Sequence, residues 1–148
     1  MQNLIDDVTK FHVAMGQPVA RRLGLPPYDR VKLRAALIVE EAMETICALT
    51  IGDKPGVTKV TIEQIKKDIM DSGDPVTDIN EVADGLIDLI YVAIGCGIEF
   101  GLPMQKLWDE VQASNMSKVG GGLDENGKVK KGPNFFKPRI GELLDLYA

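Results

Sequence analysis

The stretch DINEVADGLIDLIYVAIGCGIEF, residues 78–100, decides the fold class. Apolar residues cover nearly the whole circumference of this segment when it is wound at about 3.6 residues per turn, and such a helix is typical of a protein interior. Thr77 or Asp78 is suited to begin the helix, and Gly101 and Pro103 to end it. The sequence therefore predicts a long buried helix.

Three acidic residues nevertheless occur in this apolar helix: Glu81, Asp84 and Asp88. Their spacings of three and four residues place them on one face, which Tyr91 continues. An isolated carboxylate in a protein core costs several kcal/mol, and neighbouring like charges raise that cost. The cluster therefore predicts a positive charge among these acids.

A second acidic cluster, VEEAME at residues 39–44, lies in the preceding long predicted helix. At about 100° per residue, Glu40 and Glu44 fall within that helix's apolar arc, and Glu41 lies at its edge. A solvated face would place the acids opposite the apolar arc. Two acidic clusters on apolar arcs favour a common cationic ligand.

Three sources of positive charge are compatible with these clusters: salt bridges, shared protons, or a divalent cation. Arg34 lies near the apolar arc that holds Glu40 and Glu44 and could neutralise one acid. The ligands would all be carboxylates, and His12 is the only histidine, so a ferritin-like di-iron site is not favoured. Oxygen ligation fits Mg²⁺, with Mn²⁺ as a substitute, and Mg²⁺ usually binds substrate phosphates as well.

The remaining chain also favours helices joined by short connections. Helices are predicted over residues 3–15, 29–51 with Asp29 as N-cap, 61–70 and 104–115, with a last turn or two over 140–147. A turn is predicted over 52–58, and the Asn126-Gly127 pair predicts a small hairpin. We therefore expect one domain over residues 1–148, an all-α bundle of about four to five helices with a small irregular or hairpin C-terminal segment.

Composition narrows the class of partner. The chain has 148 residues, a formal net charge of −5 and a sequence pI near 4.9, which disfavours binding of nucleic acid by bulk electrostatics. No uninterrupted apolar run reaches about 18 residues, so no membrane span is expected. Cys47 and Cys96 lack a Cys-x-x-Cys spacing and predict free thiols in a reducing compartment, with the cytoplasm as the default location.

The ordered motifs resemble the MazG-like all-α nucleoside triphosphate pyrophosphohydrolases, a group that includes dimeric dUTPases and phosphoribosyl-ATP pyrophosphohydrolases. The resemblance rests on EExxE at residues 40–44 and on ExxDxxxDLIYV at residues 81–92. The strings VQASNMSK at 111–118 and DENGKVKKGPNF at 124–135 resemble the phage and bacterial branch. One departure is Gly85, which stands three residues before Asp88 where the family usually has Glu.

The resemblance implies a reaction and a ligand set. Water attacks the α-phosphorus of a nucleoside triphosphate and releases a nucleoside monophosphate and pyrophosphate. Glu41 is our candidate for the general base, although the sequence does not separate it from Glu40. Glu81 is a weaker candidate ligand, and Asp84 could instead support a ligand. The predicted metal ligands are Glu40, Glu41, Glu44, Asp84 and Asp88.

Candidate substrate contacts are polar residues at the two ends of the chain. In the functional interpretation, Lys118 and either Lys130 or Lys131 reach the β- and γ-phosphates, whereas in the alternative these lysines are only solvated. Asn115 could bind a base or sugar, or could cap its helix. The resemblance makes His12 a nucleotide contact. The predicted substrate-binding residues are His12, Asn115, Lys118, Lys130, Lys131 and Asn134, the last of which could simply close a turn.

A single thin domain of this kind is expected to complete its four-helix core by dimerisation. The resemblance implies a homodimer or a higher homo-oligomer with the active site near the interface. The leading expectation is Mg²⁺-dependent hydrolysis of a (deoxy)nucleoside triphosphate that clears unwanted nucleotides. The alternatives are a phosphoribosyl-ATP pyrophosphohydrolase and a non-catalytic helical dimer that binds nucleotide.

Overall fold

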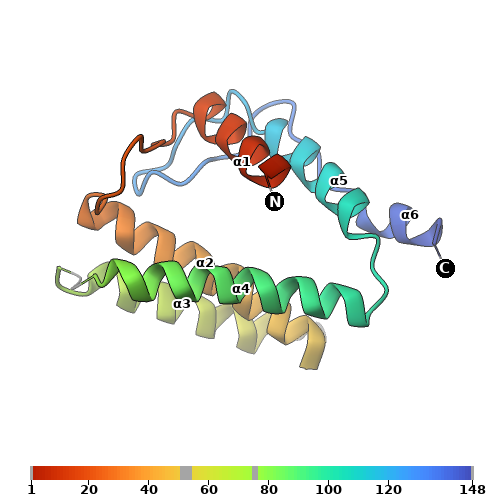
Figure 1. The fold of residues 1–148 in the computed structure, drawn as a ribbon, viewed down its shortest axis with the longest axis horizontal. Coiled ribbons are helices and arrows are strands. Elements are labelled where there is room, and N and C mark those ends of the chain that lie inside the picture. Colours follow the sequence, from red (N-terminus) through yellow and green to blue (C-terminus); the bar gives the residue numbers. More distant parts are fainter. Residues whose placement is uncertain (1, 51–54, 75–76, 148) are drawn as a thin grey trace. The chain divides into compact units, whose positions relative to one another are not determined.

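The computed structural model describes residues 2–50, 55–74 and 77–147 (Figure 1). Within these ranges the chain forms six helices and no strand, which confirms the all-α prediction. The helices are α1 (Gln2–Ala14), α2 (Tyr28–Thr50), α3 (Pro55–Asp71), α4 (Ile79–Glu99), α5 (Met104–Met116) and α6 (Ile140–Asp145). The chain groups into two compact units: residues 24–77, and residues 1–23 with 78–148.

The unit of residues 24–77 is a pair of long helices, α2 and α3, which lie side by side in Figure 1. Leu33, Ala36 and Cys47 of α2 are buried at helical intervals, as is Ile62 of α3. The Lys32 ammonium of α2 donates to the backbone carbonyl of Ser72, the residue that follows α3. The apolar arc of α2 therefore has its cover within its own unit.

Two predicted helix starts in this unit were wrong. Asp29 was expected to cap α2, but the helix begins at Tyr28, so Asp29 lies in the first turn, where its charge suits the helix dipole. The expected turn over residues 52–58 overlaps α3, which begins at Pro55 instead of Thr61. Proline is well suited to the first turn of a helix because its missing N–H has no intrahelical partner there. Residues 51–54 lie outside the described ranges.

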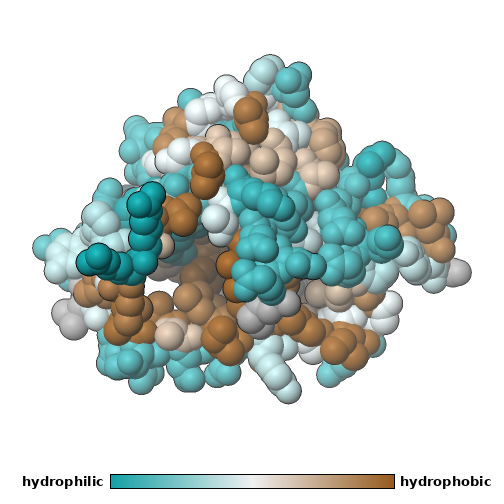
Figure 2. Space-filling view, turned by 45° about the horizontal axis from the view of Figure 1, so that its top comes forward, coloured by the Kyte–Doolittle hydropathy of each residue, from teal (hydrophilic) through white to brown (hydrophobic). Residues whose placement is uncertain are grey.

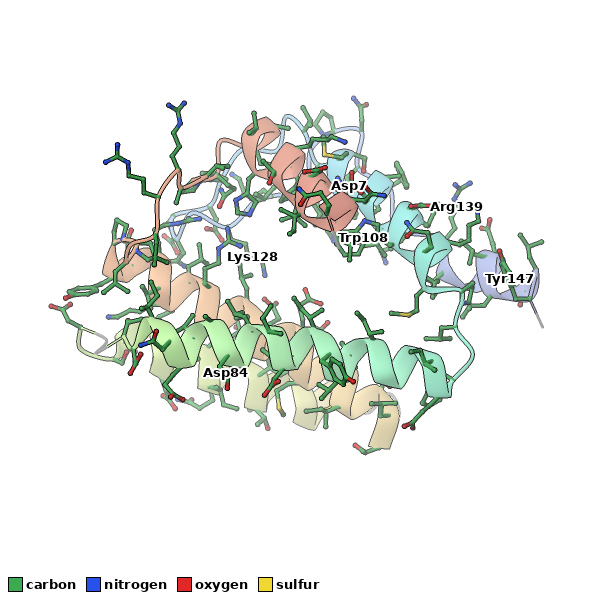
Figure 3. All side chains as sticks on the ribbon, viewed as in Figure 1. Asp7, Asp84, Trp108, Lys128, Arg139 and Tyr147 are labelled. Carbon is green, nitrogen blue, oxygen red and sulfur yellow. The ribbon has the colours of Figure 1, made fainter. Side chains whose placement is uncertain are left out.

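In the other unit, α1 packs on α5 through one acidic residue. The indole Nε1 of Trp108 donates to Asp7 Oδ2 at 3.1 Å, and Gln112 donates to the Asp7 carbonyl at 2.9 Å (Figure 3). Trp108 is half-buried at this contact. Buried Gln17, just after α1, donates to the Gly127 carbonyl at 3.2 Å and ties the C-terminal region to the same unit.

The ends of α4 are close to the prediction. Asp78 is the N-cap, and its Oδ1 accepts from the backbone N–H groups of Asn80 at 2.9 Å and Glu81 at 3.4 Å. The helix ends at Glu99, and Gly101 has a φ of 65°, a conformation that glycine adopts without strain.

The expected burial of α4 was wrong for the single chain. Gly97 is the buried residue of α4, whereas Tyr91 is 79% exposed, Val92 63% and Ile98 70%. Figure 2 shows hydrophobic side chains at the surface in several places. A uniformly apolar helix indicates that cover is needed, but not which part of which molecule supplies it.

The predicted C-terminal hairpin is reduced to a single antiparallel bridge between Leu123 and Val129. Asp124 builds the turn between them, because its Oδ1 accepts from the N–H groups of Asn126 at 2.9 Å and Lys128 at 2.8 Å. The side-chain acceptor of Asp124 therefore adds to the backbone hydrogen bonds that flank the bridge. Among the described helices, no single one is long and apolar enough to cross a membrane; only α4 and α5 taken together, bent by 119°, reach that length and composition.

Candidate functional site

The acidic cluster of α2 contains one carboxylate that is already paired. Glu40 follows Leu33 and Ala36 on the buried side of α2, and its side chain is only 18% exposed. Its Oε1 lies 3.2 Å from the Nζ of Lys66 on α3. Glu41 and Glu44 are exposed. A lysine of the neighbouring helix thus neutralises Glu40, which is the salt-bridge alternative, with Lys66 and not Arg34 as the partner at this distance.

The two neighbouring glutamates raise the pKa of Lys66. Desolvation by burial lowers the pKa of Lys66, but hydrogen bonds and charge interactions with Glu40 and Glu63 outweigh it, so the pKa lies above its ordinary value. Lys66 therefore stays protonated between the two glutamates. The pKa of Arg34 lies below its ordinary value, mainly because burial desolvates the guanidinium and to a smaller extent because Arg30 repels it.

The acidic cluster of α4 is exposed in the single chain. Glu81, Asp84 and Asp88 follow one another at helical spacing along α4, and Asp84 is labelled in Figure 3. Gly85, where the resemblance predicts Glu, has no neighbouring atom within 4 Å of the position of an added Cβ. Among the described residues, therefore, none would contact a Cβ at residue 85.

The predicted metal ligands come from both units. Glu40, Glu41 and Glu44 belong to the unit of residues 24–77, and Asp84 and Asp88 belong to the other. Within either unit, the described residues include no group of three or more His, Cys, Asp or Glu side chains gathered closely enough to hold a metal. The donor chemistry, carboxylate oxygens alone, fits Mg²⁺. A metal site shared by α2 and α4 stays a prediction.

Two predicted substrate contacts lie against each other at the end of α5. Lys118 Nζ donates to Asn115 Oδ1 at 2.7 Å, and it lies 6.0 Å from the centre of the Phe11 ring. The expected C-cap role of Asn115 was wrong, because α5 continues to Met116 and Ser117 is the C-cap. The Asn115 side chain instead orients a lysine ammonium.

His12 is held by the loop that follows α1. Its Nδ1 lies 2.9 Å from the carbonyl oxygen of Pro18, and since a carbonyl only accepts, Nδ1 carries the proton in this contact. His12 also lines an apolar hollow of about 770 Å³ in the same unit, together with Trp108. The hollow lies among residues of α1, α4 and α5.

The remaining predicted contacts lie on the returning arm of the C-terminal region. Lys130, Lys131 and Asn134 are exposed, and Lys131 Nζ lies 4.9 Å from the centre of the Phe135 ring. A close backbone crossing at Gly121 and Gly132, which was not predicted, brings this stretch of chain beside the segment that begins at Lys118. The run of three glycines at residues 120–122 was the available signal.

One comparison with known proteins gives a match. The model of the family described as phosphoribosyl-ATP pyrophosphohydrolase matches residues 8–115, well over half of the chain. The matched range contains all five predicted metal-binding acids and ends at Asn115, before the lysines of the C-terminal region. No curated protein and no solved structure matches the chain.

Proposed function

Since the chain belongs to the phosphoribosyl-ATP pyrophosphohydrolase family of the MazG-like all-α superfamily, it is a pyrophosphohydrolase, and we propose that it hydrolyses a (deoxy)nucleoside triphosphate with Mg²⁺. The observation that carries the proposal is the ordered pair of acidic clusters on α2 and α4, both within the matched range. The products are a nucleoside monophosphate and pyrophosphate.

The acidic residues have two tasks in the proposed reaction. Glu40, Glu44, Asp84 and Asp88 would hold the metal through carboxylate oxygens, and bound Mg²⁺ would offset the charge that develops on the phosphate oxygens. Glu41 accepts a proton from the attacking water. The new bond joins the water oxygen to the α-phosphorus, and the bond from that phosphorus to the bridging oxygen breaks as pyrophosphate leaves.

The pairing of Glu40 supports Glu41 as the base. Lys66 lies 3.2 Å from Glu40, and an ammonium at that distance stabilises the carboxylate and makes it a weaker proton acceptor. Glu41 is the next residue, is exposed, and lies at the edge of the same arc. The two glutamates, which the sequence did not separate, are therefore in different environments.

Substrate charge is proposed to be met by the C-terminal region. A triphosphate carries negative charge that an acidic protein must offset locally. Lys118, with Lys130 or Lys131, supplies cations for the β- and γ-phosphates, and His12, Asn115 and Asn134 are proposed nucleotide contacts. Their arrangement around one loop crossing supports a common ligand for the lysines.

We further propose that α4 is covered by a second copy of the chain. Its large apolar side chains between Val82 and Ile98 are exposed by 41% or more, and the hollow of about 770 Å³ extends this apolar surface toward α1 and α5. Contiguous apolar surface of this extent is typical of an interface between subunits. A homodimer through α4 would supply the helices of a four-helix core.

The test of the reaction is pyrophosphate release from a panel of ribo- and deoxyribonucleoside triphosphates and phosphoribosyl-ATP. Each is measured with Mg²⁺, with Mn²⁺ and with a chelator. We expect metal-dependent turnover of at least one triphosphate, and a loss on the order of 10²-fold or more in Glu41→Gln. Asp71→Asn at the end of α3, an exposed acid outside the predicted site, is the control and should keep its rate.

Two outcomes would contradict the proposal. Turnover of phosphoribosyl-ATP alone would assign the alternative substrate, and equal rates with metal and with chelator would remove the cation from the mechanism. A full rate in Glu41→Gln would exclude this residue as the base.

A further inference from the structure

Two backbone segments of the C-terminal region cross at Gly121 and Gly132. A Cβ added to Gly132 would lie 2.8 Å from the Lys118 carbonyl oxygen and 2.9 Å from the Gly121 nitrogen. A Cβ added to Gly121 would lie 2.7 Å from the Gly132 nitrogen and would also overlap the Lys130 carbonyl. Real Cβ atoms essentially never approach other atoms within 3.0 Å, so the crossing needs glycine on both segments.

Backbone hydrogen bonds between the two segments keep the register of the crossing. The Lys130 N–H donates to the Gly122 carbonyl at 3.0 Å, whereas the Gly121 N–H donates within its own segment, to the Lys118 carbonyl at 3.1 Å. Farther out, the Asp124 N–H donates to the Lys128 carbonyl at 2.9 Å. The outgoing segment 118–122 is therefore fixed against the returning segment 128–132.

The chain just after the returning segment is attached to the end of α5. Ser114, which is 3% exposed, donates from Oγ to the Phe136 carbonyl at 2.7 Å, and the Phe136 N–H donates to Ser117 Oγ at 3.1 Å. A buried hydroxyl that is satisfied in this way resists displacement. The crossing is thus anchored to a helix, and is more restricted than an ordinary surface loop.

Lysines occupy both segments at the crossing. The Lys118 carbonyl lies against Gly132, as does the Val119 carbonyl, and the Lys130 carbonyl lies against Gly121, so each lysine belongs to a segment whose backbone touches the other segment. Asn115 accepts a hydrogen bond from the Lys118 ammonium, and the Lys131 ammonium lies beside the Phe135 ring. A linear polyphosphate, with anionic oxygens along its length, is the ligand class that suits several ammonium groups brought together.

We infer that the Gly121–Gly132 crossing is a positioning device that makes Lys118 and Lys130 act on one polyphosphate chain. The inference rests on the proposed function for the identity of that chain, the β- and γ-phosphates of the substrate. The glycines bind nothing themselves. They determine the separation of the two lysines, so that each ammonium contributes more when the other is present.

The test is a set of binding measurements with inorganic tripolyphosphate by isothermal titration calorimetry, without metal and at low ionic strength. Lys118→Met and Lys130→Met should each weaken binding by about tenfold, the loss of one charge-assisted hydrogen bond. Their double variant should lose less than the product of the two single effects, since they share a ligand. Gly132→Ala should weaken binding to a similar degree.

A readout beyond stability separates positioning from folding. If Gly132 acts through the lysines, Gly132→Ala should have little further effect in the Lys118→Met/Lys130→Met background, and in turnover it should raise KM more than it lowers kcat. The control is Gly141→Ala in α6, where an added Cβ meets nothing within 4 Å, and it should bind as the wild type does.

Each outcome decides the inference. Independent, multiplicative effects of the two lysine substitutions, or no tripolyphosphate binding by the wild type, would overturn it. If Gly132→Ala does not fold, the comparison of the two single lysine variants with their double variant decides alone. Tripolyphosphate binding without nucleotide turnover would sink the proposed function and keep the crossing as an anion site. Turnover that is insensitive to both lysines would sink only the inference.

Discussion

Helices α2 and α4 carry similar acidic patterns, but they differ in how far their apolar side chains are buried. The buried residues of α2, Leu33, Ala36 and Cys47, lie along one side of the helix, and Glu40 on that side meets Lys66 of α3. On α4, by contrast, Tyr91 and Val92 remain mostly exposed. The structure therefore pairs α2 with α3, whereas the apolar side chains of α4 that were predicted to be buried stay exposed.

The difference shows that amphipathic pattern and burial are separate pieces of information. A helix with one apolar stripe can be completed by one neighbour, and α3 is that neighbour for α2. A helix that is apolar all round needs neighbours on several sides. We attribute the exposure of α4 to surfaces that a second copy of the chain would cover.

The largest expected effect is the loss of association when a charge is placed on α4. In Val92→Glu, an uncompensated carboxylate would enter the proposed interface, at a cost of several kcal/mol. Analytical ultracentrifugation should show a wild-type oligomer and a monomeric variant. Ile46→Glu is the matched control, because Ile46 is 50% exposed on α2, whose cover is already present in the chain.

Either of two results would break the comparison between the helices. A monomeric wild type would mean that α4 needs no second copy, and a Val92→Glu oligomer of unchanged mass would move the interface elsewhere. Dissociation by Ile46→Glu would show that α2 is as incomplete as α4.

Local signals predicted much of the fold. The N-cap at Asp78 and the helix end before Gly101 follow from short-range chemistry, and both were confirmed. The start of α3 at Pro55 was missed, because Gly52 and Gly56 favoured a turn whereas proline is also compatible with a first helical turn. Lys66 was not foreseen as the partner of Glu40, since a contact between helices depends on their packing and not on spacing within one helix.

A medium effect is expected at the junction of α2 and α3. Lys66→Met removes the cation beside Glu40, whose side chain is only 18% exposed. The free energy of unfolding should fall by about 1–2 kcal/mol, between the values for exposed and buried pairs. Chemical denaturation measures this change. Lys67→Met, an exposed neighbour on α3, is the control.

The same variant tests the proposed metal site. If Glu40 is a ligand, Lys66 competes with Mg²⁺ for its carboxylate, so Lys66→Met should bind Mg²⁺ more tightly in a calorimetric titration despite its lower stability. Weaker or unchanged Mg²⁺ binding would assign Glu40 to the α2–α3 contact alone and would leave Glu44 as the proposed metal ligand from α2.

The candidate site was less predictable than the fold, for a physical reason. Residue types suggested carboxylates for a metal and lysines for phosphate, and the family match covers the carboxylates. The relation between Lys118 and Lys130 depends on a backbone crossing that spacing does not reveal. Gly121 and Gly132 are eleven residues apart, and only their three-dimensional contact shows why both must lack a side chain.

The smallest effect is expected at the ion pair between α5 and the residue before α6, which tests whether pairs outside the α2–α3 contact contribute less. Glu110 accepts from the Arg139 backbone N–H at 2.8 Å, Nε at 3.0 Å and Nη2 at 3.2 Å. These hydrogen bonds lower the pKa of Glu110 below its ordinary value of 4.5, so its contribution to stability is present above that pH and is lost as the pH falls through the lower folded-state value.

Glu110→Gln should therefore lower the melting temperature at pH 7 by less than Lys66→Met does, because the Arg139 side chain is 63% exposed and water screens the pair. The difference between wild type and Glu110→Gln should shrink as the pH falls below about 4.5. Glu125→Gln, at the exposed turn, is the control. A difference that grows in acid would mean that Glu110 is stabilised in its protonated form, which is incompatible with three N–H donors directed at its oxygens.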